Sequence, residues 1–175
     1  MLKLSSSLRN QPVMSLRSGG PVATAVEPVI NPHNLKILGW WCKAPGGKEL
    51  VLLADNVREV MSTGLAVNDE EALSTPDELV RFSEILGIRF QLIDKPVKTK
   101  RQKLGRVSDF SYNDGLFVQK LYVARNLVKV FSSVDTLLID RTQILEVTDH
   151  YILVRDTDIK VGEEELVSAY GTAAA

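Results

Sequence analysis

The chain has 175 residues, of which 45% are hydrophobic, so it can bury a core as one ordinary domain or two very small ones. Its net charge of -1 excludes a global field that would recruit nucleic acid or a membrane surface, so any electrostatic function must be local. Cys42 is the single cysteine, which excludes an internal disulfide, and apolar runs such as Leu50–Ala54 are far shorter than the roughly 20 residues that span a bilayer.

Residues 1–12, MLKLSSSLRNQP, contain no stretch resembling the apolar core of about 7 to 15 residues that defines a signal peptide. We therefore expect a protein of the cytoplasm with no transmembrane segment.

Short strands follow in the first half of the chain. They are rich in β-branched and aromatic residues and are separated by the turn sequences RSGG, NPHN and APGG. The predicted strands are Val13–Leu16, Ala25–Ile30, Leu35–Cys42, Glu49–Leu53 and Leu65–Val67.

The segment NDEEALSTPDELVRFSEILGIRF differs in character and predicts a helix of about ten residues. Thr75 suits its N-cap, Pro76 its first position, Glu78 completes a capping box, and Gly87 suits its end. Because its apolar side chains form one stripe, we expect this helix to pack against the β-structure.

The second half repeats the strand pattern, and Tyr112-Asn113-Asp114-Gly115 predicts a tight hairpin turn. Identities recur in order, which indicates an internal duplication. At a spacing of 84 they are Leu8/Leu92, Pro12/Pro96, Val13/Val97 and Arg17/Arg101. The next turn is predicted to be three residues longer in the first copy, so the spacing falls to 81, with Val26/Val107. At a spacing of 87 the identities are Leu50/Leu137, Glu59/Glu146, Val60/Val147, Val67/Val154 and Asp69/Asp156.

We therefore expect a mostly β protein with two small antiparallel β-barrels in tandem, joined by a short helix. The predicted boundaries are 8–69 for the first barrel, 70–90 for the helical linker, 91–156 for the second barrel and 157–175 for a C-terminal tail.

The second copy resembles the PRC-barrel family. The residues that carry the resemblance are Leu92-Ile93-Asp94-Lys95-Pro96-Val97, then Lys103-Leu104-Gly105-Arg106-Val107-Ser108-Asp109, then the strand from Gly115 to Val123. Asp94 stands where the family usually has a glycine. In the first copy Thr24 is aligned with Gly105 and Pro28 with Asp109, so that copy is more divergent.

This resemblance implies a tandem PRC-barrel protein. The family includes the photosynthetic reaction-centre H subunit, the ribosome maturation factor and archaeal cell-division proteins, which use the barrel to bind other macromolecules. The resemblance therefore implies a binding module and names no partner.

Residues suited to catalysis or metal binding do not form a set. His33 and His150 lie in predicted turns without a paired nucleophile, and Cys42 has no cysteine or histidine at metal-ligand spacing. We expect no enzymatic activity, no metal and no cofactor.

Trp40 and Trp41 are consecutive in one predicted strand, so their side chains point to opposite faces. One indole must then leave the interior of its own barrel. It either packs under the helix or against the second barrel, or it forms an external binding surface.

Six cations without an acid among them lie between positions 95 and 106, in a predicted hairpin of the second copy: Lys95, Lys98, Lys100, Arg101, Lys103 and Arg106. The aligned hairpin of the first copy has only Arg17. The cations either protect a solvated strand edge or bind a partner.

The sequence thus predicts a non-enzymatic adaptor that mediates protein–protein interaction in the cytoplasm. Two alternatives use the basic hairpin 95–106: an RNA-associated factor in ribosome assembly or RNA processing, and a peripheral adaptor on an anionic membrane surface.

Overall fold

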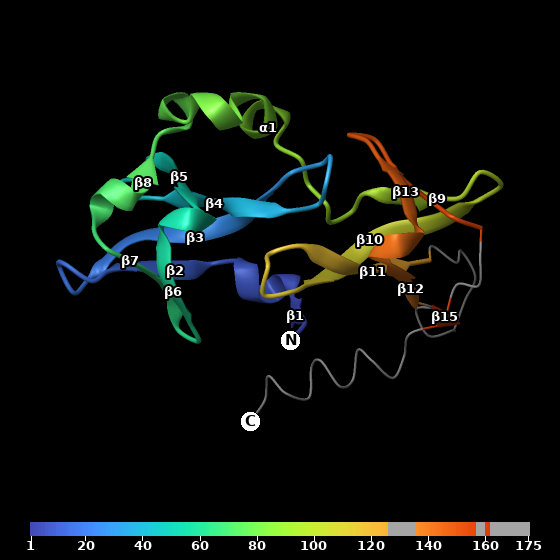
Figure 1. The fold of residues 1–175 in the computed structure, drawn as a ribbon, viewed down its shortest axis with the longest axis horizontal. Coiled ribbons are helices and arrows are strands. Elements are labelled where there is room, and N and C mark those ends of the chain that lie inside the picture. The colour runs from blue at the N-terminus through green and yellow to red at the C-terminus, as the bar shows by residue number, and fades with distance from the viewer. Residues whose placement is uncertain (126–135, 157–159, 162–175) are drawn as a thin grey trace. The chain divides into compact units, whose positions relative to one another are not determined.

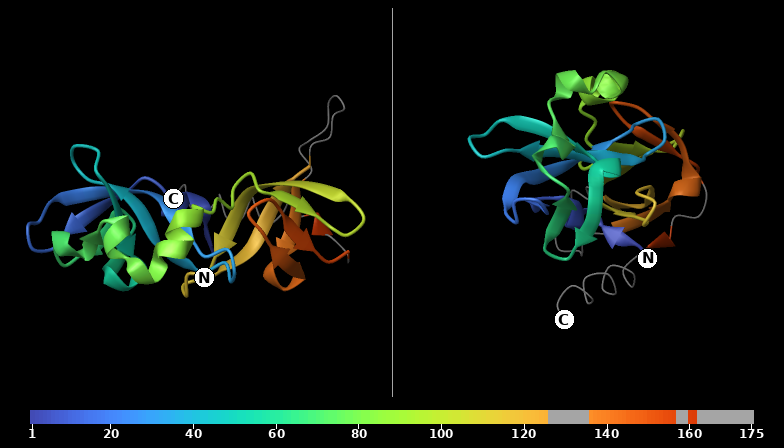
Figure 2. Two further views of the ribbon diagram at one scale, coloured as in Figure 1. Left: turned by 90° about the horizontal axis from the view of Figure 1, so that it is seen from above. Right: turned by 60° about the vertical axis from the view of Figure 1, so that its left-hand side comes forward.

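The computed structural model describes residues 1–125, 136–156 and 160–161. The chain divides into two compact units, one of Ser6–Phe90 and one that combines Met1–Ser5 with Gln91–Ala175. Each unit contains one strongly curled β-sheet (Figures 1 and 2). The predicted mostly β class is confirmed.

The sheet of the first unit has the strand order β6-β7-β2-β3-β4-β5-β8. Neighbours are antiparallel except for β2 and β7, which run parallel. The strands are β2 (Gln11–Ser15), β3 (Pro21–Ile30), β4 (Ile37–Lys43), β5 (Glu49–Leu53), β6 (Val57–Met61), β7 (Gly64–Val67) and β8 (Leu73–Ser74).

The sheet of the second unit has the order β13-β14-β9-β10-β11-β12-β15, with β14 and β9 parallel. The short strand β1 (Lys3–Leu4) joins this sheet by pairing with the far end of β10, although it precedes the first unit in sequence. The other strands are β9 (Pro96–Lys98), β10 (Lys103–Tyr112), β11 (Val118–Ala124), β12 (Thr136–Asp140), β13 (Ile144–Val147), β14 (Ile152–Val154) and β15 (Lys160–Val161).

The predicted duplication is present in the strand pairing. β3 carries an extra residue between Ala25 and Glu27, as β10 does between Val107 and Asp109. A second shift places the extra residue in the neighbouring strand, between Ile37 and Gly39 of β4 and between Val118 and Lys120 of β11. A β-bulge inserts one residue and bends its strand, so the repeated bulges give both sheets the same curl.

The bulges also correct the sequence alignment. Ala25 pairs with Cys42 as Val107 pairs with Val123, so Ala25 and not Val26 is equivalent to Val107, and the spacing there is 82. Six residues separate the paired Met14 and Pro21, whereas four separate Lys98 and Lys103. The first-copy turn is therefore two residues longer, and the prediction of three was wrong.

Equivalent positions also form the interior of each sheet. Their side chains are all at most 2% exposed: Val13/Val97, Ala25/Val107, Ile37/Val118, Trp40/Leu121, Leu52/Ile139 and Leu65/Ile152. The two cores differ in side-chain size at several places, but the backbone pattern is shared.

The segment predicted as one helix is broken. A 3-10 turn covers Pro76–Glu78, a second covers Val80–Phe82, and α1 contains only Ser83–Ile88. The predicted capping box is present, with the amide of Thr75 donating to Glu78 Oε2 at 2.7 Å. The C-cap is Arg89 at φ 48, not Gly87.

The backbone leaves the helical region at Leu79, with φ -91 and ψ 56, between the two 3-10 turns. Leu79, Phe82 and Ile85 pack against the cluster of Val29, Trp41, Val51 and Leu86 in the first unit. Residues 70–90 thus belong to the first unit by their contacts.

Gly105 provides a test of the bulged geometry of β10. Its φ is +151, and a Cβ atom there would lie 2.1 Å from the carbonyl oxygen of Ala124. We expect Gly105→Ala to reduce the free energy of unfolding by about 2 kcal/mol or more, measured by urea denaturation. Gly20→Ala is the control, because nothing lies within 4 Å of its Cβ position. Equal stability of the two variants would contradict this geometry.

Cys42 provides a test of the first core. It is 1% exposed, and burial raises the pKa of its thiol to about 12. The raised pKa means that this group supports folding fully below an unfolded-state pKa of about 8.5, and that its support is lost as pH rises from there towards 12. We expect a thiol reagent at pH 8 to label the protein only in denaturant, as measured by mass. Rapid labelling of the native protein would place Cys42 outside the core.

Candidate functional site

The predicted basic hairpin is present as β9, a turn at Thr99–Gln102, and the start of β10. Thr99 is only 3% exposed, and its amide donates to the carbonyl of Gln102 at 2.9 Å. Its hydroxyl oxygen accepts from the amides of Arg101 and Gln102, both at 3.2 Å. A buried polar side chain therefore holds the tip in one conformation.

Alternation along the hairpin separates apolar from charged side chains. Val97 and Leu104 are buried, at 1% and 4% exposed. Lys98 and Lys103 are directly opposed partners in the ladder, so they project from the same, outer face. Like charges directly opposite each other destabilise a sheet, so the fold alone gives no reason for this pair.

A groove of about 720 Å³ runs along this outer face, and a second hollow of about 430 Å³ adjoins it around the hairpin tip. The two share Lys98, Gln102, Lys103 and Tyr151, so we treat them as one surface and call it the basic groove. Its other lining residues are Pro96, Val97, Thr99, Lys100, Arg101, Leu104, Gly105, Arg106, Arg125 and Leu153.

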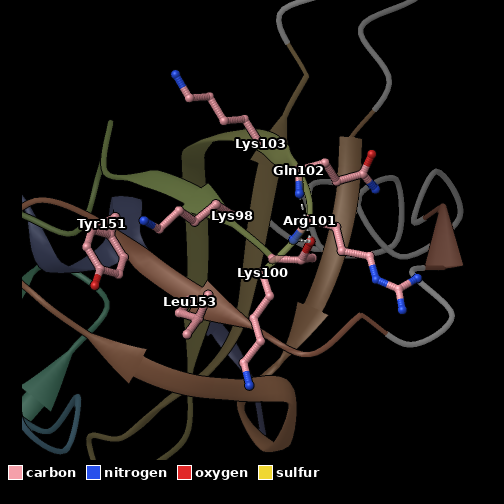
Figure 3. A pocket seen from close by; sticks show the side chains of 8 residues that line it. Lys98, Lys100, Arg101, Gln102, Lys103, Tyr151 and Leu153 are labelled. Carbon is pink, nitrogen blue, oxygen red and sulfur yellow. Dashed lines mark hydrogen bonds between the residues drawn. The ribbon is translucent and has the colours of Figure 1, made fainter.

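Tyr151 forms one wall of the basic groove. The Nζ atom of Lys98 lies 3.6 Å from the centroid of the Tyr151 ring, and Figure 3 shows the lysine side chain extending toward that ring. The Tyr151 hydroxyl donates to Glu146 Oε2 at 3.2 Å, and this hydrogen bond raises the pKa of the phenol. The aromatic face toward Lys98 is therefore already occupied by a cation.

Three of the six predicted cations have partners within the second unit. Lys95 Nζ donates to the carbonyl of Asp149 at 2.6 Å, and partial burial lowers the pKa of its ammonium group against the opposing effect of the Asp149 charge. Arg106 donates to the carbonyl of Asp94 at 2.8 Å. Arg101 pairs with Asp156 at 3.1 Å.

The cations near the tip do not converge on one point. Figure 3 shows Lys100, Arg101 and Lys103 leaving the turn in different directions. A small anion would need several donors aimed at one position. The arrangement suits a ligand that extends along the surface.

The first copy offers a comparison on the same backbone. At the positions of Lys98, Lys103, Arg106, Arg125, Tyr151 and Leu153 it has Met14, Pro21, Thr24, Ala44, Gly64 and Ala66, as the matching ladders show. All four cations and the aromatic ring are therefore specific to the second copy.

The structure also places the predicted tryptophans. Trp40 and Trp41 are 2% and 7% exposed, and Trp41 packs with Leu86 of α1. The guanidinium of Arg89 lies 4.2 Å from the centre of the Trp41 ring and forms an ion pair with Glu49. Both indoles thus contribute to packing of the first unit in this structure.

Sequence reasoning missed Arg125, Tyr151 and Leu153, which come from strands distant in sequence from the hairpin. The signal that could have found two of them is the duplication, because the spacing of 87 aligns Tyr151 with Gly64 and Leu153 with Ala66.

Across residues 1–125, 136–156 and 160–161, no group of three or more His, Cys, Asp and Glu side chains is arranged to hold a metal ion. Within the same residues, no helix is long and apolar enough to span a membrane.

Comparison with known proteins returns no relative: no protein-family model matches the chain, and no curated protein sequence matches it. The resemblance of the second copy to PRC-barrels therefore stays a prediction from its motif residues.

The wall of the groove yields a pH prediction. Removing the acceptor by Glu146→Gln should lower the pKa of the Tyr151 phenol toward its ordinary value, because the hydrogen bond to the carboxylate is what raises it. The measurement is the ultraviolet titration of each protein minus that of its Tyr151→Phe version. Glu59→Gln is the matched control, since Glu59 pairs with Ala66 in the first copy as Glu146 pairs with Leu153 in the second. An unchanged titration after Glu146→Gln would show that the contact is not formed in solution.

Proposed function

We propose that this chain is a non-enzymatic adaptor of the cytoplasm, built from two PRC-type barrels, and that its second barrel binds a protein partner through the basic groove. The motif of residues 92–109, the duplicated bulges and the curled sheets support the PRC-type assignment.

The observation that carries this proposal is the difference between the two copies. They share pairing, bulges and core positions, so the fold can be built without a charge at the positions of Lys98, Lys103, Arg106 and Arg125, as the first copy does. The second copy nevertheless opposes Lys98 and Lys103 and adds Arg125 and Tyr151 beside them. Charges that the fold does not require are expected at binding surfaces.

Affinity capture from lysate of the source cells tests the proposal, with nuclease treatment in parallel. The test variant reverses Lys98, Lys100, Arg101 and Lys103 to Glu. The control reverses four exposed cations of the first unit, Arg17, Lys43, Lys48 and Arg58, and so carries the same change in net charge.

We expect a set of proteins that is retained by the parent and by the control, lost by the groove reversal, and unaffected by nuclease. Capture that disappears with nuclease would identify RNA as the partner. Membrane fragments captured in place of discrete proteins would identify an anionic lipid surface. Either result, or identical captures by parent and reversal, would contradict a protein partner at the groove.

A further inference from the structure

We infer that the occupant of the basic groove is an extended acidic peptide segment of the partner, held across the outer face of β14, β9 and β10 by Lys98, Lys103 and Arg125. This inference deepens the proposed function and depends on it for the existence of a protein partner.

The first step concerns the charges. The structure shows no carboxylate within 4 Å of Lys98, Lys103 or Arg125 among its described residues, whereas Arg101 and Arg106 already have Asp156 and Asp94. Because Lys98 and Lys103 are opposed on one face, a carboxylate bound between them would convert a repulsive pair into two attractive ones. Arg125, which lines the same groove, adds a planar guanidinium that suits a second carboxylate.

The second step concerns the shape. Gly105 lines the groove beside Arg106 without a side chain. A hollow of about 720 Å³ can hold several residues of an extended chain. In such a chain every second side chain points to the same face, about 7 Å apart, so one peptide can present one carboxylate to the Lys98 and Lys103 pair and another to Arg125.

The third step concerns the backbone. β9 lies between β14 and β10 and is hydrogen-bonded to both, so the groove does not offer a free strand edge. A peptide therefore cannot bind here by adding a strand to the sheet, and its acidic side chains must supply the recognition.

Two features favour carboxylates over a nucleic acid. Single-stranded nucleic acids bind by stacking bases on aromatic rings, but Lys98 covers a face of Tyr151, the one aromatic residue among those that line the groove. Asp94, Glu146 and Asp156 also contact groove residues. These carboxylates repel an anionic ligand. The repulsion is greater for a nucleic acid, which has a phosphate on every nucleotide, than for a peptide with an acidic residue at every second position.

The test measures binding of a fluorescein-labelled peptide of about 12 residues that alternates Glu and Ser, by fluorescence polarisation at low and high salt. The groove variant is K98M/K103T/R125A. Met at 98 and Ala at 125 are the residues that the first copy has at the equivalent positions. At 103 the first copy has Pro21, but Thr is used there because proline would remove the backbone amide. The control variant, R17M/K43M/R58M, removes three exposed cations from the first unit. A Gln/Ser peptide, a single-stranded RNA and vesicles with and without acidic lipid are compared as ligands.

We expect the Glu/Ser peptide to bind parent and control equally, to bind the groove variant at least about 10-fold more weakly, and to be released by salt. The Gln/Ser peptide should not bind. Equal binding by groove variant and parent, tighter binding of RNA or acidic vesicles, or no binding of the Glu/Ser peptide would overturn the inference. Circular dichroism of each variant establishes that it is folded. If the Glu/Ser peptide fails this test but the groove still captures proteins from lysate, the acidic-peptide inference is wrong and the proposed function is still supported.

Discussion

A ten-residue strand lies at the centre of each sheet, and two β-bulges bend it at equivalent points, one where it pairs with the preceding strand and one where it pairs with the following strand. The bend allows one strand to pair with different neighbours at its two ends and to place buried side chains along its whole length. A shift of one residue in a strand exchanges its inner and outer faces, so the bulges also decide which residues reach the surface. The positions of Lys103 and Arg106 outside, and of Leu104 and Val107 inside, follow from this constraint.

Given that shared backbone, the two copies differ mainly in what they present outward. The first uses its outer face to bind its own helical segment, where Trp41 and Val51 contact Leu86. The second places cations and Tyr151 around a groove over β9 and β10. The buried positions are therefore equivalent in the two copies, whereas the side chains on the outer faces differ. Duplication of a small curled sheet therefore gives one unit whose outer face is covered by its own helical segment and one unit that is proposed to bind a partner.

The sequence predicted the β class, the hairpin at 95–106 and the capping box at Thr75, because each depends on local patterns. It misaligned β3 because the Val26/Val107 identity placed three extra residues in the first-copy turn, where the strand pairing shows two. It overestimated the helix because the backbone leaves the helical region at Leu79, which the apolar pattern does not mark. It missed Tyr151 and Arg125 because only the strand order brings them to the hairpin.

The most direct measurement is an amide correlation spectrum of the nitrogen-15-labelled protein, titrated with the alternating Glu/Ser peptide. If the second copy alone carries the site, peaks from 97–106, 125 and 151–153 will shift. Peaks from the equivalent positions 13–24, 44 and 64–66 will stay in place. Shifts spread over exposed cations of both copies, or centred on the first, would contradict the assignment of binding to the basic groove.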